Sequence, residues 1–409
     1  MLMIIISTFV ACGGSKVEIN TPLTEEQRIE DFNYLYKTIE ENYPFLEVNK
    51  RVNNIDWLSK KEEYLQRVKN TTNDNEFLLV LYSILSDLNN GHTNMITDSS
   101  QFRYFREIYS MNKGWQKKVQ LPVLNNEKAL ARYNIDKDEK VEVLEQGKGG
   151  KIEGISNASV KDVVEGKIGY IYIPQMISYY NMGKDIELID DYLNKIKEYQ
   201  ALVIDIRGNS GGDSYYWMSY LVPKLIDEVY KNTTYNFLKD GDVINNYLKK
   251  SKSKSYTGFG EVKDLDTSTL VNLPVEVEED FKYYSKSIME ITPKEDSIKF
   301  KGNIYLLVDK WVYSSSETFA SFAKQTGFAT LIGERTGGDG IGSDPLLDML
   351  PNSGYVFRFS KDMGVTADGT SNEEFKTEPD YAIEYAGKTG DFENDYCIKK
   401  ILELEEINK

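Results

Sequence analysis

Short apolar runs alternate with helical patterns from about residue 166 onward, and this alternation constrains the fold more than any other feature. The runs of strand length are residues 169–173, 201–206, 304–308 and 329–333. Helical patterns follow the first three runs, at residues 186–199, 215–225 and 317–326. Residues 201–206 are nearly all apolar, as expected of a strand buried on both faces. Repeated strand–helix–strand units predict a layered α/β domain over residues 166–395.

The segment before this domain, residues 22–99, is predicted to be helical. Thr24 and Gln27 have the spacing of a capping box at the start of a helix. Helical patterns continue as far as Asn89-Asn90-Gly91, which favour the left-handed conformation that ends a helix. The only histidine of the chain, His92, follows directly. We therefore expect its side chain at the mouth of a helix end.

Residues 100–165 have a weaker pattern. Alternating side chains at 140–144 and the glycines within 146–154 favour strands and turns, so we expect a small β-rich linking segment without a recognisable PDZ module. Residues 396–409 are expected to form a C-terminal helix or tail. The sequence thus predicts a multidomain α/β (or α+β) protein.

The first eleven residues are almost wholly apolar and are followed by Cys12-Gly13-Gly14-Ser15. Such a run is too short to cross a bilayer and is typical of a secretory signal. The segment Phe9-Val10-Ala11-Cys12 resembles the bacterial lipobox, in which the cysteine is lipidated. We expect residues 1–21 to be a leader and tether, and the protein to be exported and anchored to the bacterial cell membrane through Cys12. The alternative is a buried N-terminal strand.

Composition excludes several classes of function. The net charge is −16, and clustered Lys and Arg are lacking, so nucleic acid is not an expected partner. One histidine and two cysteines are too few for a zinc-type site, and we expect no metal. With Cys12 lipidated, Cys397 would have no disulfide partner, so we expect a thiol packed in the core.

Two junctions between a strand and a helix carry polar residues that can do chemistry. At the first, Gly211 and Gly212 let the backbone approach a bound atom and present its N–H groups. At the second, Ser314-Ser315-Ser316 precedes a helix whose free N–H groups and dipole favour negative charge.

A serine nucleophile needs a base, and His92 is the only imidazole available. Each feature also has a simpler interpretation. The glycines could form a tight turn, the serines could cap a helix together with Glu317, and His92 could cap a helix end. From composition alone, any of the three serines could be the nucleophile.

Together these segments resemble the C-terminal processing (tail-specific) serine peptidases, and within them the tricorn-core type. Asp205-Ile206-Arg207-Gly208-Asn209-Ser210-Gly211-Gly212 reproduces the family pattern Asp-x-Arg-x-Asn-x-Gly-Gly. Ser314 lies three positions before Glu317, as in the family, and residues 333–338 and Pro379-Asp380 match two further motifs. The resemblance covers about residues 166–390 and implies a crotonase/ClpP-like layered core.

The resemblance also implies which residues catalyse. One branch of the family uses a lysine 25 positions after the serine, but that position is Asp339, and no lysine occurs between 325 and 360. The tricorn-core branch uses a histidine and a glutamate instead. It implies Ser314 as nucleophile, His92 as base and a glutamate six positions before Pro379 as the residue that orients His92. That glutamate is Glu373, with the adjacent Glu374 left open, and Thr93 is the candidate fourth member.

The implied reaction is hydrolysis of a peptide or protein substrate by an endopeptidase, without cofactor. The N–H of Ser315 and that of Gly211 or Gly212 would form the oxyanion hole. Two alternatives stay open: a catalytically silent peptide- or lipid-binding lipoprotein on the same scaffold, and an acyl-thioester enzyme of the crotonase type. The sequence indicates neither the natural substrate nor the oligomeric state.

Overall fold

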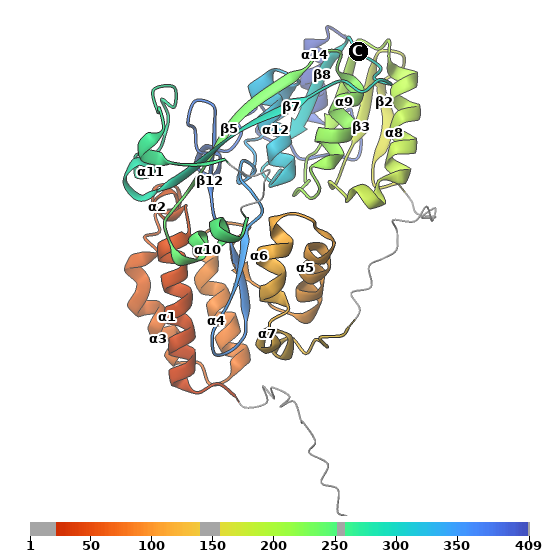
Figure 1. Cartoon of the computed structure of the whole chain (residues 1–409). Helices are drawn as coiled ribbons and strands as arrows, with labels where there is room; N and C mark the ends of the chain where they lie inside the picture. Colours follow the sequence, from red (N-terminus) through yellow and green to blue (C-terminus); the bar gives the residue numbers. More distant parts are fainter. Residues whose placement is uncertain (1–21, 140–155, 252–257, 408–409) are drawn as a thin grey trace, which may run out of the picture.

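The computed structural model describes residues 22–139, 156–251 and 258–407. The expected leader with Cys12 lies outside these ranges, as do the strand and turns expected at 140–154. Within the described ranges, no helix has both the length and the apolar character needed to cross a membrane. Figure 1 shows a helical body below and an α/β body above, joined by the long strands β5 and β7.

A six-stranded sheet forms the centre of the α/β body, in the order β13-β9-β8-β4-β3-β2. All neighbours are parallel except β2 and β3. The strands are β2 (Ser159–Val164), β3 (Ile168–Tyr172), β4 (Ala201–Asp205), β8 (Asn303–Val308), β9 (Thr330–Gly333) and β13 (Tyr381–Ala382). The four strands expected from the sequence are therefore present, and the layered α/β core is confirmed.

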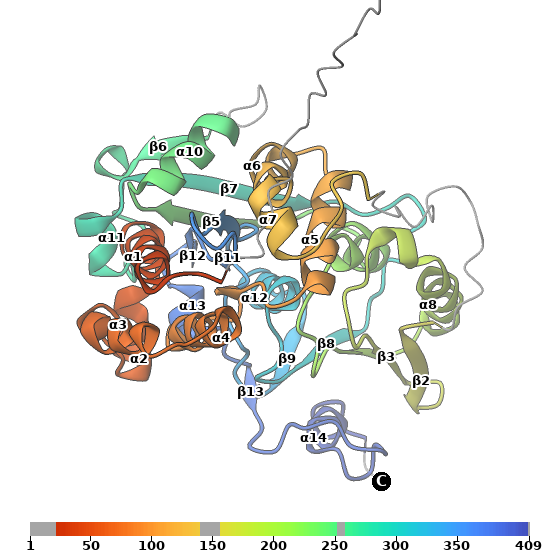
Figure 2. The same ribbon diagram turned by 90° about the horizontal axis from the view of Figure 1, so that it is seen from below.

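Helices cover both faces of this sheet, as Figure 2 shows. On one face lie α8 (Gly183–Ile196), the π-helical segment Tyr216–Leu221 with α9 (Val222–Leu225), and α12 (Ser315–Thr326). On the other face lies α14 (Tyr396–Leu404), the expected C-terminal helix. Alternate residues of β4 serve the two layers: Leu202 packs toward α12 and Val203 toward α14. Cys397, the second residue of α14, is fully buried against the sheet, as expected of a core thiol.

The helical body begins as the sequence predicts. Thr24 forms both hydrogen bonds of the capping box with Gln27. The first helices are α1 (Glu25–Asn42), α2 (Leu46–Asn53), a 3-10 turn (Leu58–Lys60), α3 (Lys61–Lys69) and α4 (Asp74–Ser86). After α4 the chain turns through Asn89, which has the positive φ of a helix-ending residue, and reaches His92.

The expected β-rich segment at 100–165 is wrong for its first part. The chain there forms α5 (Ser99–Met111), α6 (Trp115–Leu124) and α7 (Glu127–Arg132). Asp98 caps α5, and Phe102, Phe105 and Tyr109 bury one face of it. A buried arginine on that face and a proline inside α6 weaken the local helical pattern, but packing against the rest of the body outweighs both.

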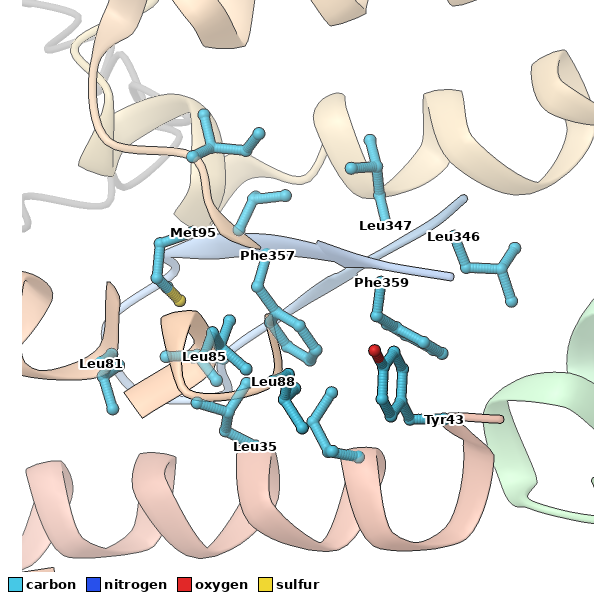
Figure 3. Close-up of a cluster of buried hydrophobic side chains, with 14 of the residues drawn as sticks. Leu35, Tyr43, Leu81, Leu85, Leu88, Met95, Leu346, Leu347, Phe357 and Phe359 are labelled. Carbon is cyan, nitrogen blue, oxygen red and sulfur yellow. The ribbon is translucent and has the colours of Figure 1, made fainter. Parts of the chain in front are cut away.

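A hairpin from the expected core range completes the helical body. The strands β10 (Leu346–Met349) and β11 (Val356–Phe359) pair antiparallel with each other, and β11 also pairs with β1 (Asn94–Met95). Figure 3 shows Phe357 and Phe359 among leucines of α1 and α4. The boundary expected at 166–395 is therefore interrupted, because residues 346–359 pack with the helices. This hairpin holds His92, which precedes β1, close to the core.

A second, antiparallel sheet in the order β12-β5-β7-β6 spans the two bodies. Its strands are β12 (Met363–Thr366), β5 (Tyr230–Leu238), β7 (Tyr283–Ile291) and β6 (Phe259–Glu261). The adjoining helices are α10 (Asp242–Ser251), α11 (Val275–Asp280) and α13 (Asn372–Phe375). Tyr230 packs with the α/β body while Phe237 packs with the helical body, so β5 ties the two together.

Candidate active site

Ser314 occupies the sharp turn between β8 and α12. Its backbone has φ 55° and ψ −123°, in the left-handed half of the map that residues other than glycine seldom adopt. Such strained turns cluster at functional sites and project the side chain away from the sheet. A Cβ atom on Gly211 would lie 2.9 Å from both the Cβ of Ser314 and the backbone nitrogen of Ser315. Position 211, which packs against this turn, therefore has no room for a side chain larger than that of glycine.

The structure distinguishes the three serines. The hydroxyl of Ser214 donates to Ser315 Oγ at 2.9 Å, and Ser316 Oγ donates to Asn209 Oδ1 at 2.7 Å. Both Ser315 and Ser316 are buried. Ser314 is half-buried, and its hydroxyl has no hydrogen-bond partner within the described ranges. Ser314 is therefore the serine that is available to react.

His92 lies against the turn that carries Ser314. Its ring packs on Tyr313, with centroids 4.9 Å apart, and Tyr313 directly precedes Ser314. The hydroxyl of Tyr313 accepts from the Gly91 N–H at 3.1 Å, which ties the histidine loop to the serine turn. No hydrogen bond joins His92 to Ser314 among the described residues. Such contacts are often long without substrate and shorten when substrate binds.

The carboxylate beside His92 is Asp339. The distance from His92 Nδ1 to Asp339 Oδ2 is 2.8 Å, and Asn90 Nδ2, Ser360 Oγ and the Tyr313 hydroxyl donate to the same oxygen at 2.8, 2.9 and 3.2 Å. Burial opposes ionisation of Asp339, but the neighbouring imidazole and the hydrogen bonds outweigh it and lower the pKa of Asp339 below its usual range. An ionised Asp339 that accepts from Nδ1–H leaves Nε2 of His92 free to accept a proton.

The expectation that Glu373 orients His92 is wrong. Glu373 Oε1 accepts from Asn90 Nδ2 at 3.1 Å, the same nitrogen that donates to Asp339, and within the described ranges Glu373 forms no hydrogen bond to the imidazole. Burial raises the pKa of Glu373 well above its usual range, and the negative charge of Asp339 raises it further. Burial and the nearby Asp339 therefore favour the protonated form of Glu373, whereas the contacts of Asp339 favour its ionised form.

The two remaining candidates do not touch the nucleophile. Glu374 forms an ion pair with Arg51 of α2, with Oε2 2.6 Å from Nη2, and so links α13 to the helical body. Thr93 is buried, and its hydroxyl donates to Asn90 Oδ1 at 2.9 Å. Thr93 therefore supports Asn90, which in turn contacts both acids.

The structure also distinguishes the three backbone N–H groups expected in the oxyanion hole, those of Gly211, Gly212 and Ser315. The N–H of Gly211 already donates to Asn209 Oδ1 at 2.9 Å, so it is not available to a substrate. Gly212 is held by a parallel bridge to Met176, in which its own N–H takes no part. Within the described ranges, neither this N–H nor that of Ser315 donates to a protein acceptor. The N–H groups of Gly212 and Ser315 are thus the two expected oxyanion donors that remain available to a substrate beside Ser314.

The comparisons decide the family. A model described as peptidase family S41 matches residues 167–383, which is more than half of the chain. The chain belongs to peptidase family S41. The resemblance to C-terminal processing proteases is thereby confirmed, and the protein is a serine-type peptidase.

Solved structures support the fold of this S41 peptidase. A candidate peptidase from Parabacteroides merdae ATCC 43184 aligns with a TM-score of 0.55 and 20% identity, over 93% of this chain and 97% of that one. Mature CPAF complexed with lactacystin aligns with a TM-score of 0.55 and 14% identity, over 88% of this chain and 94% of that one. No match was found among curated proteins.

Glu317 holds the Asp339 loop of the S41 peptidase in place. This buried residue of α12 accepts from Asn372 Nδ2 at 2.7 Å and from Thr377 Oγ1 at 2.6 Å. Asn372 Oδ1 in turn accepts the N–H groups of Gly340 and Ile341. From the sequence, Glu317 is expected to be a motif residue and a capping residue. The contacts show that it stabilises the loop that carries Asp339.

Sequence reasoning missed Asp339, Asn90, Tyr313 and Ser360. The family spacing marks position 339 only as a place where the lysine of the other branch is absent. A carboxylate at that position was itself a usable signal, because a base near a serine needs a partner. Asn90 and Tyr313 adjoin His92 and Ser314 along the chain, but nothing in the sequence brings Ser360 to them.

Proposed function

We propose that this S41 peptidase is an endopeptidase in which Ser314 attacks the substrate carbonyl, His92 acts as general base and Asp339 orients His92. The observation that carries the proposal is the contact chain from Asp339 through His92 to the ring of Tyr313, which adjoins the strained Ser314. Asp339 replaces Glu373 in this role because Asp339, and not Glu373, contacts Nδ1.

The chemical steps follow from these positions. His92 Nε2 takes the proton of Ser314 Oγ as Oγ bonds to the carbonyl carbon, and the carbonyl oxygen becomes an oxyanion. The N–H groups of Gly212 and Ser315 stabilise that charge, and each such donor typically contributes on the order of 100-fold in rate. His92 then passes the proton to the leaving amine, which departs. Water, activated by His92, hydrolyses the acyl-enzyme and restores the serine.

A fluorophosphonate probe tests this function directly, because it reacts with an activated serine without needing the right peptide. We expect the folded wild-type protein to be labelled, and digestion with mass spectrometry to place the adduct on Ser314. A folded protein that resists the probe would support the silent binding protein instead. An adduct on Ser315 or Ser316 would move the nucleophile.

We also propose that the protein is exported and lipid-anchored through Cys12, so that it meets its substrates outside the cytoplasm. The support is the apolar leader followed by the lipobox-like Phe9-Val10-Ala11-Cys12. Membrane fractionation of the full chain and of Cys12→Ser should show wild type in the membrane fraction and the variant released. Equal distribution of the two would contradict lipidation.

A further inference from the structure

An exposed cluster of tyrosines lies next to the loop that carries Gly211 and Gly212. It consists of Tyr179 and Tyr180, which follow β3, and Tyr215, which follows Gly212. The rings of Tyr179 and Tyr215 have centroids 4.4 Å apart, and those of Tyr179 and Tyr180 are 5.7 Å apart in an edge-to-face arrangement. Tyr179 is 48% exposed and Tyr180 58% exposed, so the cluster presents aromatic surface to solvent.

One carboxylate fixes the two halves of this cluster. Asp213 accepts the N–H of Tyr179 on Oδ2 and the N–H of Tyr215 on Oδ1, each at 3.0 Å. The N–H of Asp213 itself donates to the carbonyl of Met176 at 2.7 Å. The backbones of Tyr179 and Tyr215 are therefore held in position before any ligand arrives, which lowers the entropic cost of binding.

The segment from Asp213 to Tyr215 is also hydrogen-bonded to the residue that follows the nucleophile. Ser214, between Asp213 and Tyr215, donates to Ser315 Oγ at 2.9 Å, and Ser315 directly follows Ser314. Gly212, one residue before Asp213, supplies the open N–H beside the serine turn. The tyrosine cluster is thus linked to the serine turn through Asp213 and Ser214, close to where a peptide carbonyl would bind between Ser314 and Gly212.

We propose that Tyr179, Tyr180 and Tyr215 form a subsite that binds an aromatic or large aliphatic side chain of the peptide close to the scissile bond. This inference rests on the proposed endopeptidase function and names its substrate class. Tyrosine rings offer large, stiff contact surfaces, and an aromatic partner gains edge-to-face contacts beyond the burial of area. The adjacent carboxylate of Asp213 already accepts the N–H groups of Tyr179 and Tyr215, and the three rings themselves carry no charge, which favours an apolar side chain over a cationic one.

The test compares quenched alanine-rich peptides that carry one central phenylalanine, one central lysine or alanine throughout. We expect wild type to cleave the phenylalanine peptide best and within one or two residues of that phenylalanine, as mapped by mass spectrometry. In Tyr179→Ala and Tyr215→Ala, the loss of kcat/KM on the phenylalanine peptide should exceed the loss on the all-alanine peptide by about tenfold. Tyr396→Ala, which removes a similarly exposed tyrosine from α14 on the opposite face of the sheet, is the matched control and should leave both rates unchanged.

Fluorophosphonate labelling of the same variants separates the two proposals. Variants that label at the wild-type rate but lose activity equally on all peptides would overturn the subsite and leave the nucleophile standing. A selective loss on the lysine peptide would show a cationic subsite and also overturn it. A folded wild type that does not label would remove the peptidase mechanism, and the subsite with it.

Discussion

Ser314→Ala is expected to lower peptide hydrolysis about a million-fold while the protein remains folded. The hydroxyl of Ser314 has no hydrogen-bond partner among the described residues, so its removal leaves no buried group unpaired. The strained backbone is retained, because alanine at a positive φ has the same Cβ restriction as serine. Initial rates and circular dichroism, measured on the same preparation, check both parts of the prediction.

The neighbouring serines provide the control. Ser315→Ala keeps the backbone N–H proposed for the oxyanion hole and removes only the acceptor of the Ser214 hydroxyl. Ser316→Ala removes the hydrogen bond to Asn209. We expect much smaller losses of activity in both, together with a measurable loss of stability. Hydrolysis that survives in Ser314→Ala but disappears in Ser315→Ala would transfer the nucleophile by one position.

The parts of the fold that could be predicted are those in which local sequence and tertiary environment agree. The run 201–206 is apolar at nearly every position because β4 is covered on both faces. The cap at Thr24 depends on residues three positions apart. Helix α5 could not be read in this way, since its buried face includes Arg106, which a periodicity count scores as polar. Arg106 is accommodated through hydrogen bonds to Asn125 and the carbonyl of Lys137, which only the folded chain brings together.

The candidate site shows the same limit. Ser314 and His92 could be named because one lies in a local motif and the other is the only histidine. Counting from the serine reaches the carboxylate Asp339, but only the contacts between distant elements show that Asp339, and not Glu373, adjoins His92. Glu317 and Asn372 hold the N–H groups that follow Asp339, while Asn90 donates to both Asp339 and Glu373. Counting six positions back from Pro379 selects Glu373, whose carboxylate accepts from Asn90, whereas Asp339 contacts His92.

Asp339→Asn is therefore expected to lower kcat by at least about a thousandfold, whereas Glu373→Gln should change it far less. The amide oxygen of asparagine can still accept from Nδ1–H, but it is neutral. The imidazolium that forms when His92 takes the proton of Ser314 then lacks its counter-charge in a buried site, where charge interactions are weakly screened. Steady-state kinetics on one peptide compare the two variants, with Glu374→Gln as a control for an acidic residue that only binds Arg51.

The free energy of unfolding should change in opposite directions in Asp339→Asn and Glu373→Gln. Measuring it shows whether a loss of activity comes from unfolding and not from the lost catalytic group. The pKa of Asp339 is lower in the folded protein, so its ionised form stabilises the fold above the usual carboxyl pKa, and this stability is lost as the pH falls through the folded value. Asp339→Asn loses that contribution at neutral pH. The pKa of Glu373 is raised by burial and by Asp339, so the folded protein keeps a proton that the unfolded chain releases above a pH of about 4.3.

Release of this proton on unfolding therefore lowers the free energy of unfolding of the wild type by about 1.4 kcal/mol per pH unit above that value, up to the pKa of Glu373 in the folded protein. Glutamine resembles the protonated acid and removes this slope, so Glu373→Gln should gain stability over wild type as the pH rises from 5 to 8. Denaturant unfolding across that range measures the difference. If Glu373→Gln instead loses both stability and kcat while Asp339→Asn stays active, Glu373 is the residue that supports His92 and Asp339 only fills the space beside it.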